Sequence, residues 1–245
     1  MQLYFIRHGQ STNNVRDGDL TPRSSDPELT EKGVRQAELL AEFLAASESG
    51  TSDPGDDPLN RRGFDLTHLY CSLMKRAIHT GNIIAQRLNL PLFGMPEAHE
   101  VGGVFLETLV NDVVTVNEEY GVDEGFLATN YPNLILTQPI PRSGWWRGGK
   151  ENDKLPQKRA QKVLEWLRQH HASTDDRVAI VTHGGFYNYL LRAMLHISPE
   201  EPDNRKLGYR LVYNNCAISR FDLTEDRVYM VYHNRAEYLP DDLIT

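Results

Sequence analysis

Three short, strand-like runs, each followed directly by polar residues and then a helical pattern, constrain the fold of this chain most strongly. They span residues 3–6, 66–71 and 178–182 and are rich in apolar, aromatic and β-branched residues. Such runs are typical of strands buried on both faces. Because strands that alternate with helices form parallel sheets with both faces covered, we predict an α/β fold: an open, mostly parallel sheet with helices on both faces.

Apolar residues at helical spacing define the intervening elements. The pattern predicts helices over residues 31–46, 73–88, 156–171 and 184–195, and closing strands over 211–213, 217–223 and 228–232. Thr30 and Ser72 can cap the first two helices, and Pro156 suits the first turn of the third.

Two stretches depart from this alternation. Residues 47–63 are rich in Ser, Asp, Gly and Pro, so we expect a surface excursion that buries little. Residues 104–153 lack a clear period and are too long for a structureless loop in a compact domain, so we expect an inserted lid with some helix of its own. We expect residues 1–245 to form a single domain.

Composition limits the partners of the chain. A formal charge of −8, from 34 acidic and 26 basic residues, gives no reason to expect binding to nucleic acid or an anionic membrane. No apolar run approaches the roughly 18 residues of a membrane span, and the first residues lack the features of a cleaved signal. Cys71 and Cys216 are too few for a disulfide framework. We therefore expect a cytoplasmic protein that meets anionic ligands with local positive charge.

Four side chains are predicted to gather at one edge of the sheet. Arg7 and His8 follow the first strand, His183 follows the run 178–182, and Arg76 lies in the first turn after the second strand. Ligands of open α/β sheets bind at this edge, and helix N-termini favour anions. Guanidinium groups bind phosphate oxygens, and a neutral imidazole can attack phosphorus. The arrangement favours phosphate chemistry, although the Arg-His-Gly tripeptide by itself fits a surface arginine and a buried structural histidine equally well.

Four segments that follow one another along the chain carry a more specific pattern. Residues 7–14 resemble R-H-G-x-S-x-x-N, and residues 26–37 resemble D-x-x-L-T-x-x-G-x-x-Q-A. Residues 72–80 resemble S-x-x-x-R-A-x-x-T, and residues 181–185 resemble a second-histidine turn. These are the motifs of the histidine phosphatase superfamily, the phosphoglycerate mutase-like proteins. The resemblance spans residues 3–190 and leaves 47–63 and most of 104–153 unmatched.

The resemblance implies a phosphoglycerate mutase-like fold and a role for each matching residue. His8 would be the nucleophile that becomes phosphorylated. The phosphoryl group would be held by Arg7, Asn14, Arg76 and His183. The family needs no metal or other cofactor, and the sequence contains no metal-binding motif of its own. We expect the pair His170–His171, at a helix C-terminus, to complement the helix dipole rather than to bind a metal.

The leaving oxygen needs a proton donor, for which Glu100 is the candidate. Residues 100–105, a glutamate followed by glycines and an aromatic residue, resemble the acid-bearing segment of the family. The common form E-x-x-x-G-x-W-E-G is absent, so Glu97 and Glu107 are alternatives. A solvated loop carboxylate is the simpler explanation for any of the three.

Other residues are candidates for substrate contacts. Arg142, Trp145 and Arg147 lie in the predicted lid, where aromatic rings and guanidinium groups can bind the organic part of a substrate or a second phosphate. A small lid core with arginines at its edge explains them equally well. Arg23, in the loop after the nucleophile, is a further candidate, although a surface position is more typical. Asn215 lies in a segment similar to a late family segment and is expected to support the active-site loops.

The sequence thus predicts a metal-independent phosphomonoesterase that acts through phosphohistidine on a small phosphorylated metabolite. A phosphoglycerate-type mutase is the alternative, but the additional substrate-binding segments of the glycolytic mutases are not found. A protein that binds a phosphate ligand without turnover is less favoured because both nucleophile and proton donor are present. A serine hydrolase is disfavoured because no G-x-S-x-G elbow occurs. Fold alone does not select among phosphorylated substrates.

Overall fold

The computed structural model describes residues 1–15, 23–46, 57, 59–110, 113–147, 149–152, 154–198 and 211–245. Seven strands form the central sheet in the order β6-β3-β2-β7-β1-β8-β9. Their bounds are β1 (Gln2–Arg7), β2 (His68–Cys71), β3 (Leu92–Gly94), β6 (Leu134–Leu136), β7 (Arg177–Thr182), β8 (Ile218–Leu223) and β9 (Val228–Arg235). Short 3-10 helices are η1 (Thr12–Asn14), η3 (Pro96–Ala98) and η4 (Asp241–Leu243).

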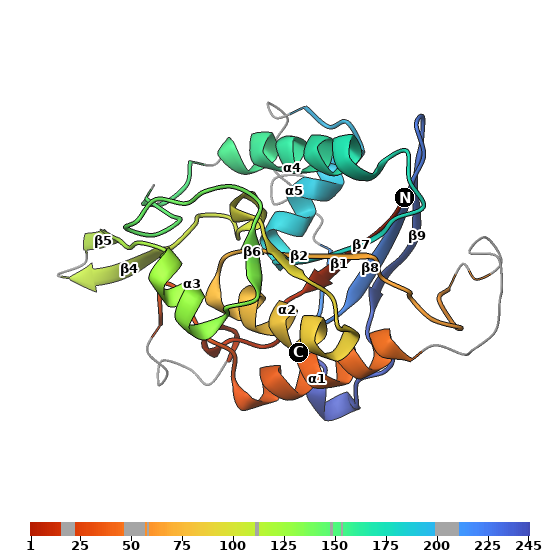
Figure 1. The fold of residues 1–245 in the computed structure, drawn as a ribbon. Helices are drawn as coiled ribbons and strands as arrows, with labels where there is room; N and C mark the ends of the chain where they lie inside the picture. The colour runs from red at the N-terminus through yellow and green to blue at the C-terminus, as the bar shows by residue number, and fades with distance from the viewer. Residues whose placement is uncertain are drawn as a thin grey trace.

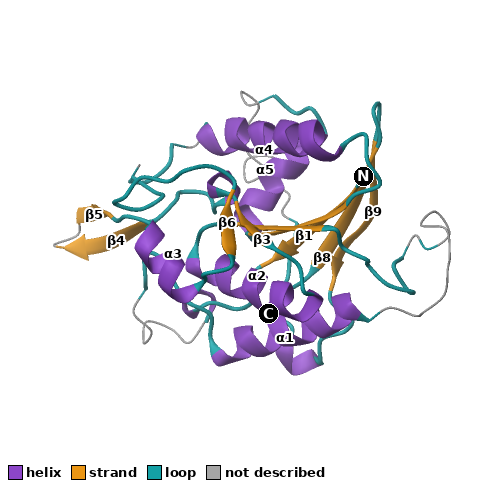
Figure 2. Ribbon diagram, in the orientation of Figure 1, coloured by secondary structure: helices purple, strands orange, loops and turns teal. Residues whose placement is uncertain are grey.

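Helices cover both faces of this sheet. Helices α1 (Glu31–Ala45) and α2 (Lys75–Leu88) pack together on one face, and α4 (Leu155–His171) and α5 (Gly184–Met194) on the other (Figures 1 and 2). Strands β6, β3, β2, β7 and β1 are parallel, whereas β8 and β9 are antiparallel to their neighbours. The predicted mostly parallel α/β fold is therefore confirmed.

The central parallel strands end at the same edge of the sheet. The His8 N–H donates to the Thr182 carbonyl at 3.0 Å, and the Ser72 N–H donates to the Val181 carbonyl at 3.0 Å. These bonds place the residues that follow β1, β2 and β7 side by side. Strands β1 and β7 are inaccessible to solvent, since residues 3–6 and 178–182 have an exposure of 0%. Their continuous apolar content reflects burial on both faces.

The predicted helix starts are confirmed in two cases and wrong in one. The Thr30 hydroxyl accepts a hydrogen bond from the Gly33 N–H at 3.0 Å and caps α1, and Pro156 lies in the first turn of α4. Ser72 does not cap α2, because extended backbone continues to Met74, which is the N-cap residue. The Ser72 hydroxyl instead accepts a bond from the Met74 N–H at 3.2 Å.

The predicted strand over 211–213 is wrong, since these residues form no strand. Tyr213 is held by its side chain instead of by a backbone ladder. Its hydroxyl donates to the Phe5 carbonyl, and its ring lies 4.4 Å from the ring of Tyr187. A run of three residues is too short for periodicity to distinguish a strand from a buried loop.

The 104–153 segment contains regular structure that its sequence did not reveal. A two-stranded hairpin, β4 (Phe105–Val110) and β5 (Val113–Glu118), projects from the body of the protein (Figure 1). Helix α3 (Glu124–Asn130) follows, and β6 then joins the central sheet beside β3. A three-residue strand carries no readable period, which explains why this edge of the sheet was missed.

The 47–63 stretch is described only from its later part, with residues 47–56 and 58 outside the described residues. Within this stretch Asn60 is buried. Its side chain donates to the Tyr4 hydroxyl at 2.9 Å and accepts bonds from Arg220 at 3.1 Å and the Tyr232 hydroxyl at 2.9 Å. An asparagine can be buried when its amide is bonded on both sides.

Among the described helices, none is long and apolar enough to cross a membrane.

Two glycines allow the loop after β1 to lie against the first turn of α1. A Cβ on Gly9 would overlap the backbone carbonyl of Gly33, and a Cβ on Gly33 would overlap the carbonyl of Gln10. The Thr30 N–H donates to the Gln10 carbonyl at 2.9 Å across this contact. Because backbone meets backbone, no side-chain movement can relieve a larger residue at either position.

Replacing Gly33 by Ala is therefore expected to lower the free energy of unfolding by about 1–3 kcal/mol, the usual cost of overpacking. Denaturant unfolding followed by circular dichroism measures this change. Gly125→Ala is the matched control, since Gly125 also lies in the first turn of a helix but a Cβ there meets only the Asp123 side chain at 3.4 Å. Equal effects of the two substitutions would contradict the proposed backbone contact.

Candidate active site

His8 lies buried at the carboxyl end of β1 with its ring orientation fixed. It is 2% exposed, and its Nδ1 lies 2.6 Å from the Gly9 carbonyl, so this nitrogen carries the proton and donates. The other ring nitrogen, Nε2, accepts a hydrogen bond from the Arg76 Nε at 3.1 Å. The lone pair required of a nucleophile is thus on Nε2, directly beside a guanidinium group.

His183 lies next to His8, as the sequence predicted. It is the N-cap residue of α5, its exposure is 0%, and the two imidazole centroids are 5.0 Å apart. The His183 Nε2 lies 2.9 Å from the Ser72 hydroxyl. The Ser72 hydroxyl, which accepts the Met74 N–H, can donate its own hydrogen to this nitrogen, and in that arrangement the His183 proton lies on Nδ1. The Nδ1 is buried and has no hydrogen-bond partner among the described residues.

Arg7 brings a second unpartnered donor to the same edge. Its Nη1 donates to the Tyr213 carbonyl, whereas its Nε is buried without a hydrogen-bond partner in the described part of the chain. Buried polar atoms are almost always bonded, so an orphaned donor is a sign of a missing ligand. With His183, Arg7 offers two such donors beside His8.

Burial and neighbouring positive charge set the protonation of this cluster. Burial lowers the pKa of His8 well below its usual range, and the charges of Arg76 and Arg7 lower it further. The pKa of His183 is likewise lowered by burial, then by Arg76 and His8. Both imidazoles are consequently neutral near pH 7 in the ligand-free protein.

Asp26 compensates part of the positive charge. Its Oδ1 lies 3.7 Å from Arg76 Nη1 and accepts the Lys75 N–H at 3.1 Å in the first turn of α2. Burial raises the pKa of Asp26 to about 6, against the opposing effect of Arg76. The helix N-terminus that we expected to favour an external anion is thus already bonded to a carboxylate of the chain itself.

Several residues of the sequence motifs support the loop after β1 without facing His8. The Gly9 N–H donates to Thr80 at 3.1 Å, and the Gln10 N–H donates to the Gln36 amide oxygen at 2.7 Å. In the sequence, only the positions of Thr80 and Gln36 within the motifs indicated that they support this loop. No sequence pattern indicated the bond between Arg7 and Tyr213 or the contact between Ser72 and His183, because each joins residues that are distant in sequence.

Asn215 supports the loop that carries His8. Its amide nitrogen donates to the His8 carbonyl at 2.8 Å and to the Asn14 side-chain oxygen at 3.3 Å. That Asn14 oxygen also accepts the Ser11 N–H and hydroxyl at 3.1 Å each. Asn14 is therefore near the loop of His8, and its role as a phosphate ligand stays a prediction.

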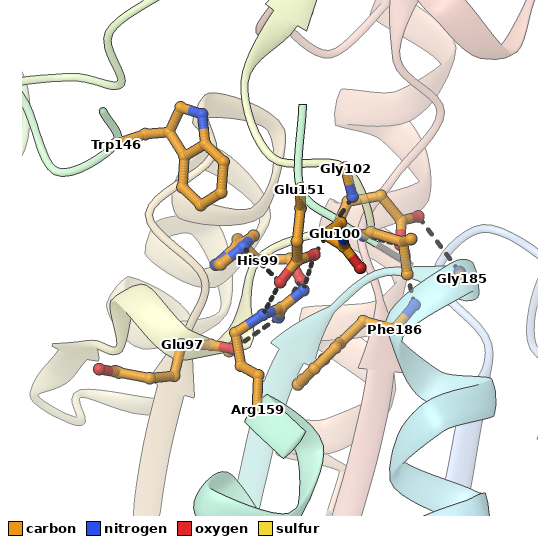
Figure 3. A network of polar contacts seen from close by, with 12 residues as sticks. Glu97, His99, Glu100, Gly102, Trp146, Glu151, Arg159, Gly185 and Phe186 are labelled. Carbon is orange, nitrogen blue, oxygen red and sulfur yellow. Dashed lines mark hydrogen bonds and ion pairs between the residues drawn. The ribbon is translucent and has the colours of Figure 1, made fainter. Parts of the chain in front are cut away.

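Glu100 lies at the same edge, bound to the start of α5. Its carboxylate accepts hydrogen bonds from the N–H groups of Gly185 at 3.2 Å and Phe186 at 2.8 Å, and from its neighbour Val101 at 2.8 Å (Figure 3). Its negative charge acts electrostatically on both Arg7 and Arg76. A Cβ on Gly185 would lie 2.5 Å from the Glu100 Oε1, so glycine is required where the carboxylate meets the helix.

The two alternative acids lie elsewhere. Glu97 points away from Glu100 and accepts a hydrogen bond from Gln138 (Figure 3). Glu107 is exposed on the hairpin and forms an ion pair with Lys150. Glu100, by contrast, is bonded to the start of α5, the helix that His183 caps.

No interaction among the described residues joins the candidate substrate-binding residues to His8. Arg23, Arg142 and Arg147 are exposed. Trp145 is 8% exposed, with its ring centroid 5.2 Å from that of His99. These positions agree with a small core inside the 104–153 segment, with arginines at its surface.

A second histidine cluster lies at the opposite edge of the sheet. His171, at the end of α4, bonds Asp176 at 2.8 Å and the Tyr70 hydroxyl at 3.0 Å, and His68 lies 3.7 Å from the same carboxylate. These three groups are close enough to hold a metal ion, but both nitrogens of His171 already have protein partners. This cluster begins β2 and precedes β7, so it lies away from His8.

The chain is similar to proteins of a known family along nearly its whole length. The family model of the histidine phosphatase superfamily (branch 1) matches residues 3–51 and 58–236. A protein of Yersinia pestis (strain Pestoides F) named "Probable phosphoglycerate mutase GpmB" is 25% identical over 237 residues, which cover 92% of this chain and 86% of that protein.

Two solved structures share the fold. The mycobacterial glucosyl-3-phosphoglycerate phosphatase in complex with VO3 is 20% identical, with a TM-score of 0.57 over 96% of this chain and 99% of that chain. The alpha-ribazole phosphatase of Shigella flexneri is 19% identical, with a TM-score of 0.58 over 96% and 97%. Because the family model matches nearly the whole chain, and its motif residues surround His8, this protein belongs to the histidine phosphatase superfamily.

Proposed function

We propose that this protein hydrolyses the phosphate monoester of a small metabolite through a phosphohistidine at His8, without a metal ion. The observation that carries the proposal is the pair of buried, unpartnered donors, Arg7 Nε and His183 Nδ1, beside a neutral imidazole with its lone pair on Nε2. A phosphoryl group supplies the anionic oxygens that such donors bond. Two buried free thiols, Cys71 and Cys216, agree with a reducing cytoplasm.

In the first step, the His8 Nε2 attacks phosphorus and the bond to the ester oxygen breaks. Arg76 donates to that same nitrogen in the free protein, so its guanidinium must turn to the phosphoryl oxygens before the attack. Arg7, Arg76 and His183 then stabilise the charge on those oxygens. Glu100 takes up a proton from solvent as the anionic substrate binds, and its carboxyl then gives this proton to the departing alcohol oxygen.

In the second step, water attacks the phosphohistidine. The Glu100 carboxylate accepts a proton from the water as the new P–O bond forms, and the P–N bond breaks to restore neutral His8. The N–H groups of Gly185 and Phe186 hold the carboxylate in place in both steps. Inorganic phosphate leaves.

A mutase is the second candidate, supported by the relative named as a phosphoglycerate mutase. It would share the first step and return the phosphoryl group to the substrate instead of to water. The site residues are the same for both reactions, so only the products distinguish them.

We expect the chelator-treated protein to release phosphate from a panel of monoesters that includes 3-phosphoglycerate, with both free phosphate and isomerised product measured. His8→Ala should abolish turnover, because it removes the attacking nitrogen, and should also abolish phosphate addition seen by intact-mass spectrometry. His170→Ala is the control, since His170 stacks on Trp166 in α4. Isomerisation without release would identify a mutase, and full activity of His8→Ala would refute His8 as nucleophile.

Glu100→Gln is expected to lower kcat by about 10²- to 10⁴-fold, the usual contribution of a general acid–base group. The loss should be greatest for alkyl phosphates, whose leaving oxygens need a proton, and smallest for p-nitrophenyl phosphate. Steady-state assays with both substrates measure this difference. Glu97→Gln should retain full activity, and an equal loss from this substitution would reopen the identity of the acid.

His8 is expected to stay uncharged as the pH is lowered from neutrality through about 6.5, the ordinary imidazole value. Its pKa is lowered, so a proton binds only at more acidic pH, and the nucleophilic form persists below 6.5. Ring-nitrogen NMR of the phosphate-free protein, assigned with His8→Ala, tests this. Protonation of His8 at or above pH 6.5 would contradict the effect of burial and of the two arginines.

A further inference from the structure

A buried ion pair lies beside the segment that carries Glu100 (Figure 3). Arg159, from α4, binds Glu151 through two parallel hydrogen bonds, Nε to Oε1 at 2.9 Å and Nη2 to Oε2 at 2.8 Å. Each residue is 8% exposed. Such a paired geometry between a guanidinium group and a carboxylate fixes direction as well as charge. Glu151 comes from the end of the 104–153 segment, so the pair joins that segment to α4.

The same guanidinium group holds the chain that leads into Glu100. Arg159 Nη1 donates to the carbonyls of Glu97 and His99, each at 2.7 Å (Figure 3). Its planar group also lies 4.3 Å from the centroid of the Phe186 ring, within cation–π range. Phe186 is one of the residues whose N–H groups donate to the Glu100 carboxylate. Arg159 therefore contacts both the segment that carries Glu100 and the helix that binds its carboxylate.

Glu151 holds the chain on the other side of Glu100. The Glu151 N–H donates to the Gly102 carbonyl at 2.9 Å, and the Gly102 N–H donates to the Glu151 Oε2 at 3.3 Å. The backbone is thus bonded at residue 99 by Arg159 and at residue 102 by Glu151. Glu100 lies between these two fixed points.

We propose that Arg159 and Glu151 are positioning residues that hold the Glu100 carboxyl in place for proton transfer. This inference rests on the proposed role of Glu100. Neither residue touches the reacting atoms; each acts through the backbone of 97–102 and through Phe186. Because Glu151 belongs to the 104–153 segment, the position of Glu100 depends on how that segment packs.

The nature of the pair agrees with this role. A lysine at position 159 would keep one positive charge but could not reach Glu151 and the two carbonyls with a planar set of donors. A glutamine at position 151 would keep the shape of the side chain but lose the charge that Arg159 requires. Both substitutions leave Glu100, Gly185 and Phe186 chemically unchanged. Arg159→Lys also keeps the positive charge, so an effect of this variant on proton transfer comes from position.

The test measures the rate of phosphohistidine formation from an alkyl phosphate in a single turnover. The variants compared are Glu151→Gln, Arg159→Lys, Glu100→Gln and the double variant Glu100→Gln/Glu151→Gln. A displacement of about 1 Å can cost about 10²-fold, so we expect a 10- to 100-fold slower step in Glu151→Gln and Arg159→Lys. In the Glu100→Gln background, Glu151→Gln should add no further loss, because effects through a shared residue do not multiply. p-Nitrophenyl phosphate should show much smaller losses.

Asp222→Asn is the matched control. It breaks another arginine–carboxylate pair with two parallel hydrogen bonds, to Arg220 on β8, at 2.7 and 2.9 Å. We expect it to lower the melting temperature and leave the rate of phosphohistidine formation unchanged. Thermal melting of every variant identifies those that are folded, and Arg159→Lys carries the test if Glu151→Gln does not fold.

The outcomes separate the two proposals. Two results would overturn the positioning role and leave the proposed role of Glu100 intact. In the first, Glu100→Gln slows the step and Glu151→Gln slows it further by the same factor as in the unmodified protein. In the second, Glu151→Gln and Arg159→Lys react like the unmodified protein. If Glu100→Gln has no effect on either substrate, the role of Glu100 fails and the inference fails with it. A slower step in Asp222→Asn equal to that in Glu151→Gln would show general destabilisation and overturn the inference.

Discussion

A neutral imidazole beside two guanidinium groups, the buried one of Arg76 and the half-buried one of Arg7, is the arrangement on which the rest of this site depends. His8 can act as a nucleophile only while it is unprotonated, and burial together with Arg7 and Arg76 favours that form. Concentrating positive charge away from water is unfavourable unless each cation has a partner. Asp26 lies beside Arg76, and the Tyr213 carbonyl accepts from Arg7. These partners allow a positive site inside a chain of formal charge −8.

The start of α5 serves the proposed acid instead of the substrate. In many α/β proteins the N–H groups at such a position bind a phosphate directly. Here the Gly185 and Phe186 N–H groups bind Glu100, and in the proposed mechanism arginine and histidine side chains bind the phosphoryl group. In this mechanism, proton transfer and charge stabilisation depend on different groups. The start of α5 holds the Glu100 carboxylate, and the arginine and histidine side chains stabilise the charge of the phosphoryl group.

The motif glycines and hydroxyls gain a physical explanation from the packing. Gly9 and Gly33 allow two backbones to touch, and Thr80 and Gln36 bond the N–H groups of the loop that follows His8. None of these residues reacts. They hold the loop that carries the Gly9 carbonyl, to which the His8 ring is bonded, and this explains why the motifs extend beyond Arg7 and His8.

The sequence by itself determined the fold class, the edge of the sheet where Arg7, His8 and His183 meet, and the family, because buried parallel strands and motif spacing are local patterns. It could not show that Ser72 bonds His183, that Tyr213 bonds Arg7, or that β6 extends the sheet, and it misplaced the cap of α2. Nor could it choose Glu100 by geometry. Those features depend on contacts between residues far apart in the chain, such as Arg159 with residues 97–102, and only tertiary packing brings such groups within hydrogen-bonding distance.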